Sequence, residues 1–166
     1  GLQLKAALKA GCKTLYLGLG GSGTHDAGCG IAAALGIRFF HQGKAFLPTG
    51  ATLNQIDAID DSESLFNQYP AQLVCLCDVT NPLFGSLGAA RVFARQKGAD
   101  QRLIEQLDQA TETLTRKVEK WKSCVLADQP GLGAAGACGL MLSGLFHCEI
   151  RSGLEQCLQW MQLDEQ

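Results

Sequence analysis

A glycine-rich stretch near the N-terminus, Gly18 to Asp26, has the residue types of an anion-binding loop. Its glycines let the backbone turn tightly and expose N–H groups, and the positive N-terminal end of a following helix adds to the attraction. The stretch fits the dinucleotide pattern G-x-G-x-x-G, but the segment about 20 positions on, Arg38 to Gln42, contains no acid to bind a ribose. The P-loop pattern is absent, because no Gly-Lys pair is followed by Ser or Thr. The open alternative is a structural turn whose glycines only let a strand and a helix pack closely.

Segments spread along the sequence give the loop a context. Residues 20–30 read GGSGTHDAGCG, residues 77–83 read CDVTNPL with VFARQKGA at 92–99, and residues 130–136 read PGLGAAG. In order and spacing these segments resemble the glycerate kinase family, whose corresponding segments are close to GGSATNDGGAG, CDVTNPL, VF-x-PQKGA and PGAGAAGG. The sequence departs from that pattern at Gly23, His25, Ala27 and Arg95. His25 stands where the family has an amide, and its ring can donate, accept or titrate, but we do not count it among the catalytic candidates.

The resemblance implies an ATP-dependent kinase that transfers the γ-phosphoryl group to a hydroxyl of D-glycerate, with Mg²⁺, and releases a phosphoglycerate. Phosphoryl transfer requires amides and a cation around the phosphates, oxygen ligands for the metal, and an oriented hydroxyl. The candidate substrate- or phosphate-binding residues in the matching segments are Gly20, Gly21, Ser22, Thr24, Asp26, Asn81 and Lys97.

Asp78 is the candidate catalytic residue and the candidate metal ligand. It follows a predicted strand, and ligands of α/β proteins gather at the carboxyl ends of strands. Carboxylates hold Mg²⁺ or accept a hydroxyl proton. The competing interpretation gives each candidate a structural role: Asp78 caps the turn through Asn81 and Pro82, Asp26 caps a helix, and Lys97 is a surface lysine.

Composition excludes several other classes of function. Apolar residues make up 46% and charged residues 18% of the sequence, the net charge is −2, and the pI is about 5.9. This balance predicts a folded soluble protein and argues against a nucleic-acid partner. No apolar run reaches the roughly 18 residues of a membrane span, and we therefore expect a cytoplasmic protein. Eight scattered cysteines without C-x-x-C predict free thiols, mostly in apolar surroundings, rather than disulfides or zinc.

The predicted fold class is α/β, with a short mixed or parallel sheet flanked by helices, a Gly-rich strand-loop-helix unit and a helical C-terminal part. Strands are expected at 13–19, buried on both faces, and at 37–40 and 71–77. A polar turn is expected at 41–44, and a short helix followed by a strand end between 48 and 64. Helices are expected at 1–10, from the loop to 35, at 88–93, 101–122, 132–146 and 152–161. The helix at 101–122 is expected to begin at an Asp100 cap and to bury Leu103, Leu107, Leu114, Val118 and Trp121 on one face.

We expect residues 1–166 to form a single α/β domain, a fragment of a longer two-domain kinase. The family's PDSFKGS-like and TGEG-x-x-D-like segments are missing from the sequence, and Gly1 opens a helical pattern without a cap. The fragment is expected to be inactive alone, with the remaining segments of the kinase as its partner. A homodimer is a possible assembly that the sequence does not decide. One rival is a non-catalytic fragment or degenerate paralogue with a structural glycine loop. A second is a dinucleotide-binding oxidoreductase, which the missing acid disfavours.

Overall fold

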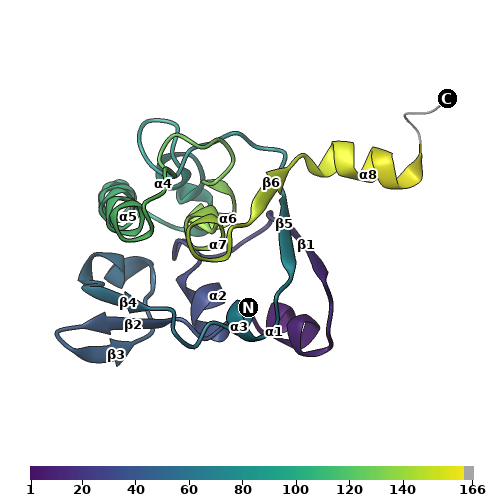
Figure 1. Cartoon of the computed structure of the whole chain (residues 1–166). Helices are drawn as coiled ribbons and strands as arrows, with labels where there is room; N and C mark the ends of the chain where they lie inside the picture. The colour runs from purple at the N-terminus through teal and green to yellow at the C-terminus, as the bar shows by residue number, and fades with distance from the viewer. Residues whose placement is uncertain (163–166) are drawn as a thin grey trace.

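The computed structural model describes residues 1–162, so the last residues of the predicted 1–166 domain lie outside the described residues. It has the predicted α/β architecture, with two small sheets on opposite sides and helices between and around them (Figure 1). The strands are β1 (Thr14–Gly18), β2 (Arg38–His41), β3 (Lys44–Phe46), β4 (Ala58–Asp60), β5 (Gln72–Leu76) and β6 (Glu149–Arg151). The α-helices are α1 (Leu2–Lys9), α2 (Cys29–Ala34), α3 (Leu65–Gln68), α4 (Ala89–Phe93), α5 (Gln101–Lys122), α6 (Ala134–Ala137), α7 (Gly139–Phe146) and α8 (Gly153–Met161). The 3₁₀ helices are η1 (Gly50–Gln55) and η2 (Arg95–Lys97).

A parallel sheet in the order β1-β5-β6 aligns the carboxyl ends of its strands. Gly18 of β1 pairs with Leu76 of β5, and Leu76 pairs with Arg151 of β6. Because the three strands run in one direction, the segments that follow them start at the same edge of the sheet. This edge brings together the glycine-rich loop, Asp78 and the start of α8.

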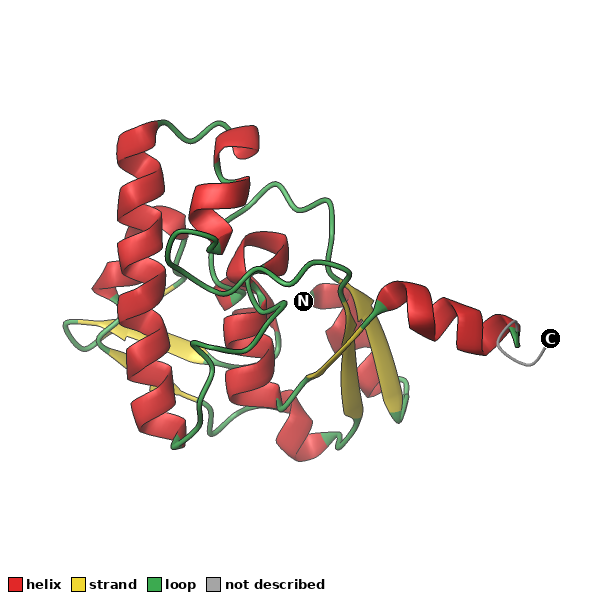
Figure 2. Cartoon of the chain, turned by 90° about the horizontal axis from the view of Figure 1, so that it is seen from above, coloured by secondary structure: helices red, strands yellow, loops and turns green. Residues whose placement is uncertain are grey.

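The expectation that the first strand is buried on both faces is wrong. Within β1 only Leu15 is buried, and Tyr16 is 43% exposed. The reason is that β1 is an edge strand whose outer face is covered in part by α8, where Trp160 meets the Tyr16 ring edge-on with centroids 4.8 Å apart. Figure 2 shows α8 projecting away from the body of the molecule.

The antiparallel sheet, in the order β3-β2-β4, contains the expected polar turn. Gln42 and Gly43 have φ of 49° and 74°, the left-handed pair that a two-residue hairpin requires. Strand β3 on the far side of this turn was not predicted, because three residues are too few to show an alternating pattern. The region between 48 and 64 forms η1 and β4, close to the predicted short helix and strand end.

Helix α5 has the predicted bounds and the predicted cap. The Asp100 carboxylate accepts a hydrogen bond from the Leu103 N–H at 2.7 Å. The predicted buried face is correct for Leu107, Leu114 and Val118 but not for Leu103 and Trp121, which are 37% and 41% exposed. They flank the buried stripe, and the small residues Ala110 and Thr111 lie within it instead.

The predicted single helix over residues 132–146 is wrong, because the backbone breaks between α6 and α7. Ala135, Gly136 and Ala137 have φ of 52°, 74° and 64°, which an α-helix cannot contain. At Gly136 a Cβ atom would lie 2.2 Å from the Thr24 carbonyl oxygen, and the Gly136 carbonyl accepts from the Ala27 N–H at 3.1 Å. The break therefore makes room for the glycine-rich loop and fixes its position.

The hydrophobic core lies between the two sheets, around α2 and α7. Its largest fully buried side chains are Phe39, Leu8, Leu35, Leu53, Ile56, Leu73, Leu83, Leu114, Leu132, Leu140, Met141 and Leu142. Five cysteines are buried, in agreement with the prediction of apolar surroundings: Cys29, Cys75, Cys77, Cys138 and Cys148. Within residues 1–162 no helix combines the length and the apolar character needed to cross a membrane.

Candidate functional site

The loop after β1 faces open space. The Leu19 N–H still donates to the Leu76 carbonyl at 2.9 Å, and the chain then leaves the sheet. A Cβ atom added at Gly20, Gly21 or Gly23 would meet no atom within 4 Å, and of these only Gly21 has a positive φ. Close packing is instead the role of Gly28, where a Cβ atom would lie 2.8 Å from the Cys138 carbonyl oxygen. The glycines of the loop are therefore not there to let a strand and a helix pack closely.

Asp26 occupies the start of α2. Its two carboxylate oxygens accept hydrogen bonds from the N–H groups of Gly28 at 3.1 Å and Gly30 at 3.0 Å. We expected the positive end of this helix to add to the attraction for an anion. The structure shows that α2 has only six residues and that the Asp26 carboxylate already binds N–H groups at its start. The groups near the loop that remain available to an anion are the loop amides and the Lys97 ammonium.

Lys97 reaches the loop from η2. Its Nζ atom donates to Ser22 Oγ at 2.7 Å and to the Thr24 carbonyl oxygen at 2.6 Å. Partial burial lowers the pKa of the Lys97 ammonium, and Asp26 acts in the opposite direction. Since an ammonium group has three N–H donors, one remains after these two bonds. The Lys97 ammonium thus joins η2 to the glycine-rich loop, although the two segments lie far apart in the sequence.

Lys97 lines two pockets. The smaller, of about 230 Å³, is lined by Gly20, Gly21, Ser22 and Val79 among others. The larger, of about 470 Å³, is lined by Thr24, His25, Asp26, Leu47, Pro48 and residues of η1 and η2. A small anion fits beside the exposed amides in the first pocket, and a small organic ligand fits in the second.

Asp78 stands at the predicted strand end but is already hydrogen bonded. Its Oδ1 atom accepts from the Ser152 hydroxyl at 3.0 Å and from the Leu154 N–H at 3.2 Å. The bond from the Leu154 N–H, followed by that from Ser152, holds the pKa of the Asp78 carboxyl below its usual range. The carboxylate is exposed and anchors the start of α8, which differs from the cap of the turn through Asn81 that we considered. The next residue, Val79, lines the smaller pocket.

Asn81 supports its own loop. Its side-chain amide donates to the Leu87 carbonyl oxygen at 2.8 Å, and its main-chain carbonyl oxygen accepts from the Gly133 N–H at 3.0 Å. No group of three or more His, Cys, Asp and Glu residues that could hold a metal ion occurs in residues 1–162. A Mg²⁺ ion would thus rely on few protein ligands, as Mg²⁺ commonly does when it is bound together with phosphates.

His25, which we did not count among the catalytic candidates, lines the larger pocket beside Lys97. Its ring is buried, and Nε2 lies 3.0 Å from Thr111 Oγ1 on α5. Burial, and then the charge of Lys97, lower the pKa of His25 to about 4 against the opposing effect of Asp26 and Asp108. The signal in the sequence was the replacement of the family's amide by an imidazole, but the sequence alone could not place that ring beside Thr111.

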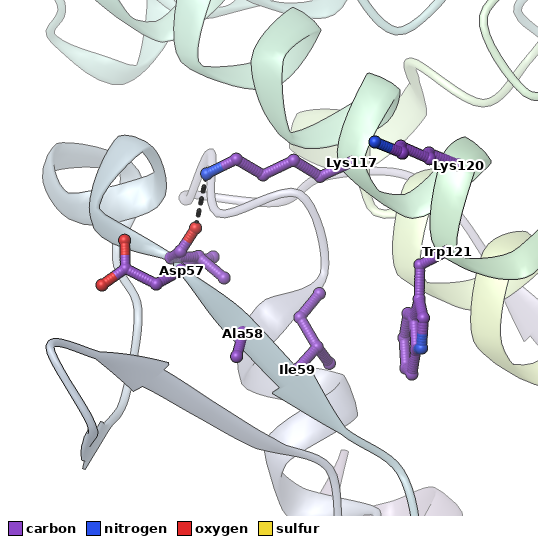
Figure 3. A pocket seen from close by; sticks show the side chains of 7 residues that line it. Asp57, Ala58, Ile59, Lys117, Lys120 and Trp121 are labelled. Carbon is purple, nitrogen blue, oxygen red and sulfur yellow. Dashed lines mark hydrogen bonds between the residues drawn. The ribbon is translucent and has the colours of Figure 1, made fainter.

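A third pocket, of about 660 Å³, lies elsewhere, between β4 and the C-terminal half of α5 (Figure 3). Lys117 crosses it to donate to the Ile56 carbonyl oxygen at 2.6 Å. The Asp57 carboxylate instead binds the Gln42 N–H at 2.7 Å. Along α5, Lys117 is about 20 Å from Leu103, which lines the pocket beside Lys97. This pocket contains none of the predicted site residues.

Fold and loop together define an α/β protein with a candidate phosphate site at the carboxyl edge of a parallel sheet. The sequence model of the glycerate kinase family matches residues 1–166, and the chain belongs to this family. It is 37% identical to a glycerate kinase of Bacillus cereus and 35% identical to glycerate 2-kinase of Escherichia coli, in each case over 96% of this chain. A proposed glycerate kinase 2 of Salmonella typhimurium has a crystal structure that superposes with a TM-score of 0.91 at 34% identity, over 98% of this chain.

The match covers only part of these relatives. The chain spans 42% of the length of the two curated relatives and 44% of the Salmonella chain. The residues described above therefore correspond to less than half of such a protein.

Proposed function

We propose that this chain forms part of a kinase that transfers the γ-phosphoryl group of ATP to a hydroxyl of D-glycerate and gives a phosphoglycerate. The observation that carries the proposal is the Lys97 ammonium beside a loop whose glycines face open space. The names of the relatives support the choice of glycerate as the acceptor. The rest of the longer kinase is then the partner that completes the site.

The phosphate end of the site is assigned to the smaller pocket. The amides of Gly20, Gly21 and Ser22 and the hydroxyls of Ser22 and Thr24 would bind phosphate oxygens. The remaining N–H of Lys97 would neutralise charge that develops on the transferred group. Asp26 contributes by fixing the end of the loop rather than by touching phosphate, because both of its oxygens are engaged and its charge would repel the ligand.

Asp78 is assigned as the carboxylate of the site. Its Oδ1 atom binds Ser152 and Leu154, and its low pKa keeps the group ionised, which suits a metal ligand or an acceptor of the substrate hydroxyl proton. Asp78 would be the residue that holds Mg²⁺, and the ion when bound would supply neutralisation of the phosphate charge. Asn81 acts here by holding the loop that carries Asp78.

The proposal is tested by following the backbone amides in ¹H–¹⁵N NMR spectra while MgATP is added to the chain. We expect the signals of Gly20, Gly21 and Ser22 to move, and the Lys97→Met variant to lose at least about tenfold in affinity, because a charged hydrogen bond is lost. Lys44→Met is the matched control, since Lys44 is an exposed lysine of the β2–β3 hairpin. Movement of signals far from the loop, or equal affinity in both variants, would favour a fragment with a purely structural loop.

A further inference from the structure

The hydrogen bonds around His25 fix which of its nitrogens carries the proton. The Thr111 hydroxyl donates its single hydrogen to the Leu107 carbonyl oxygen at 2.7 Å. It can therefore only accept from His25, which means that Nε2 carries the hydrogen and donates across the 3.0 Å contact. The pKa of about 4 keeps the ring neutral at physiological pH, so Nδ1 carries a free lone pair.

This lone pair has no partner among the residues that the structure describes. Nδ1 of His25 is buried and makes no hydrogen bond, while the whole residue is only 8% exposed. A buried acceptor without a donor is costly, and native proteins rarely keep one without a role. His25 also lines the larger of the two pockets beside Lys97, so a residue with an unused acceptor and a cationic residue border one cavity.

We propose that the larger pocket binds a small hydroxy acid, with its hydroxyl donating to Nδ1 of His25 and its carboxylate facing the positive charge of the Lys97 ammonium. The inference rests on the proposed function, to which it adds the residue that recognises the acceptor. The apolar lining from Leu47 and Pro48 suits the carbon skeleton of such a ligand. Nδ1 is shielded from water in the free chain, so the inference requires the segment from Thr24 to Asp26 to shift when the ligand enters. His25 is then a specificity-determining residue: a carboxylic acid without a hydroxyl leaves the acceptor unpaired.

Two substitutions separate this role from the contact with Thr111. An asparagine amide extends as far as Nδ1 of a histidine, and a glutamine amide as far as Nε2. His25→Asn thus keeps a polar group at the ligand side and loses the contact with Thr111, whereas His25→Gln does the reverse. The affinities of D-glycerate and of propanoate, which lacks both hydroxyls, are measured calorimetrically for the chain and both variants, with thermal melts to check folding.

We expect the unaltered chain and His25→Asn to bind D-glycerate at least about tenfold more tightly than propanoate, and His25→Gln to lose most of this preference. If His25→Gln keeps the full preference while the unaltered chain binds D-glycerate, the inference is wrong and the proposed function stands. If the unaltered chain binds no D-glycerate, the inference and the proposed function both fail. A readout without substitution is the ¹⁵N resonance of Nδ1, which should shift with D-glycerate and stay in place with propanoate; an unmoved resonance at saturating D-glycerate overturns the inference.

Discussion

Acid should destabilise this chain through His25, well before its carboxylates are protonated. The pKa of His25 is 6.5 for the ordinary side chain and about 4 in the fold. Because the folded pKa lies below the unfolded one, the stabilisation is complete above about pH 6.5 and is lost as the pH falls towards about pH 4. From about pH 7 to about pH 5, the unfolded chain takes up a proton that the folded chain does not. The free energy of unfolding should therefore fall by about 2 kcal/mol.

The assay is urea unfolding at several pH values between these limits, followed by circular dichroism. His25→Asn keeps every other titratable group, so the difference in pH dependence between the chain and this variant isolates His25. We expect the variant to lose little stability over the interval where the chain loses about 2 kcal/mol. An equal loss in both proteins would show that the His25 ring is less buried than in the structure.

Two further substitutions test how the loop is held, each with a matched control. Thr111→Val removes the acceptor of His25 Nε2 and should cost about 1–3 kcal/mol in urea unfolding, because a buried donor loses its partner. Thr113→Val, on the exposed side of the same helix with the same type of back-bond, should change stability by less than about 0.5 kcal/mol. Gly136→Ala should cost about 3 kcal/mol or more, because a Cβ atom would lie 2.2 Å from the Thr24 carbonyl oxygen. Gly43→Ala has the same φ of 74° with no atom within 4 Å, so it should cost only about 1 kcal/mol, and similar losses at both glycines would refute the close approach.

The sequence was sufficient where the signals are local. Asp100 before a long amphipathic stretch predicted both the bounds and the cap of α5, because capping and helical periodicity involve neighbouring residues. An apolar β-prone run followed by glycines predicted β1 and its loop, and another such run placed Asp78 at a strand end. The family resemblance was confirmed over the whole chain, but the roles assigned to Asp78, Lys97 and the loop stay predictions.

What could not be predicted depends on contacts between distant segments. The break at Gly136 interrupts a run of small residues that we predicted as one helix, and the backbone of Thr24 approaches closely there. The bond from Lys97 to Ser22 joins segments separated by 75 positions, so no periodicity reveals it. The partnership of His25 and Thr111 is of the same kind, since it spans 86 positions and depends on how α5 packs against the loop.

The most direct test of the central claim is calorimetric titration of MgATP into the chain, repeated with D-glycerate and with the Asp78→Ala variant. A phosphoryl-transfer site on this chain predicts saturable heats for both ligands in the folded protein, with MgATP binding weakened in the variant, whose melt still shows a folded protein. If neither ligand gives heat with a folded sample, the claim is contradicted. The chain would then be a member of the glycerate kinase family that has no phosphate site of its own.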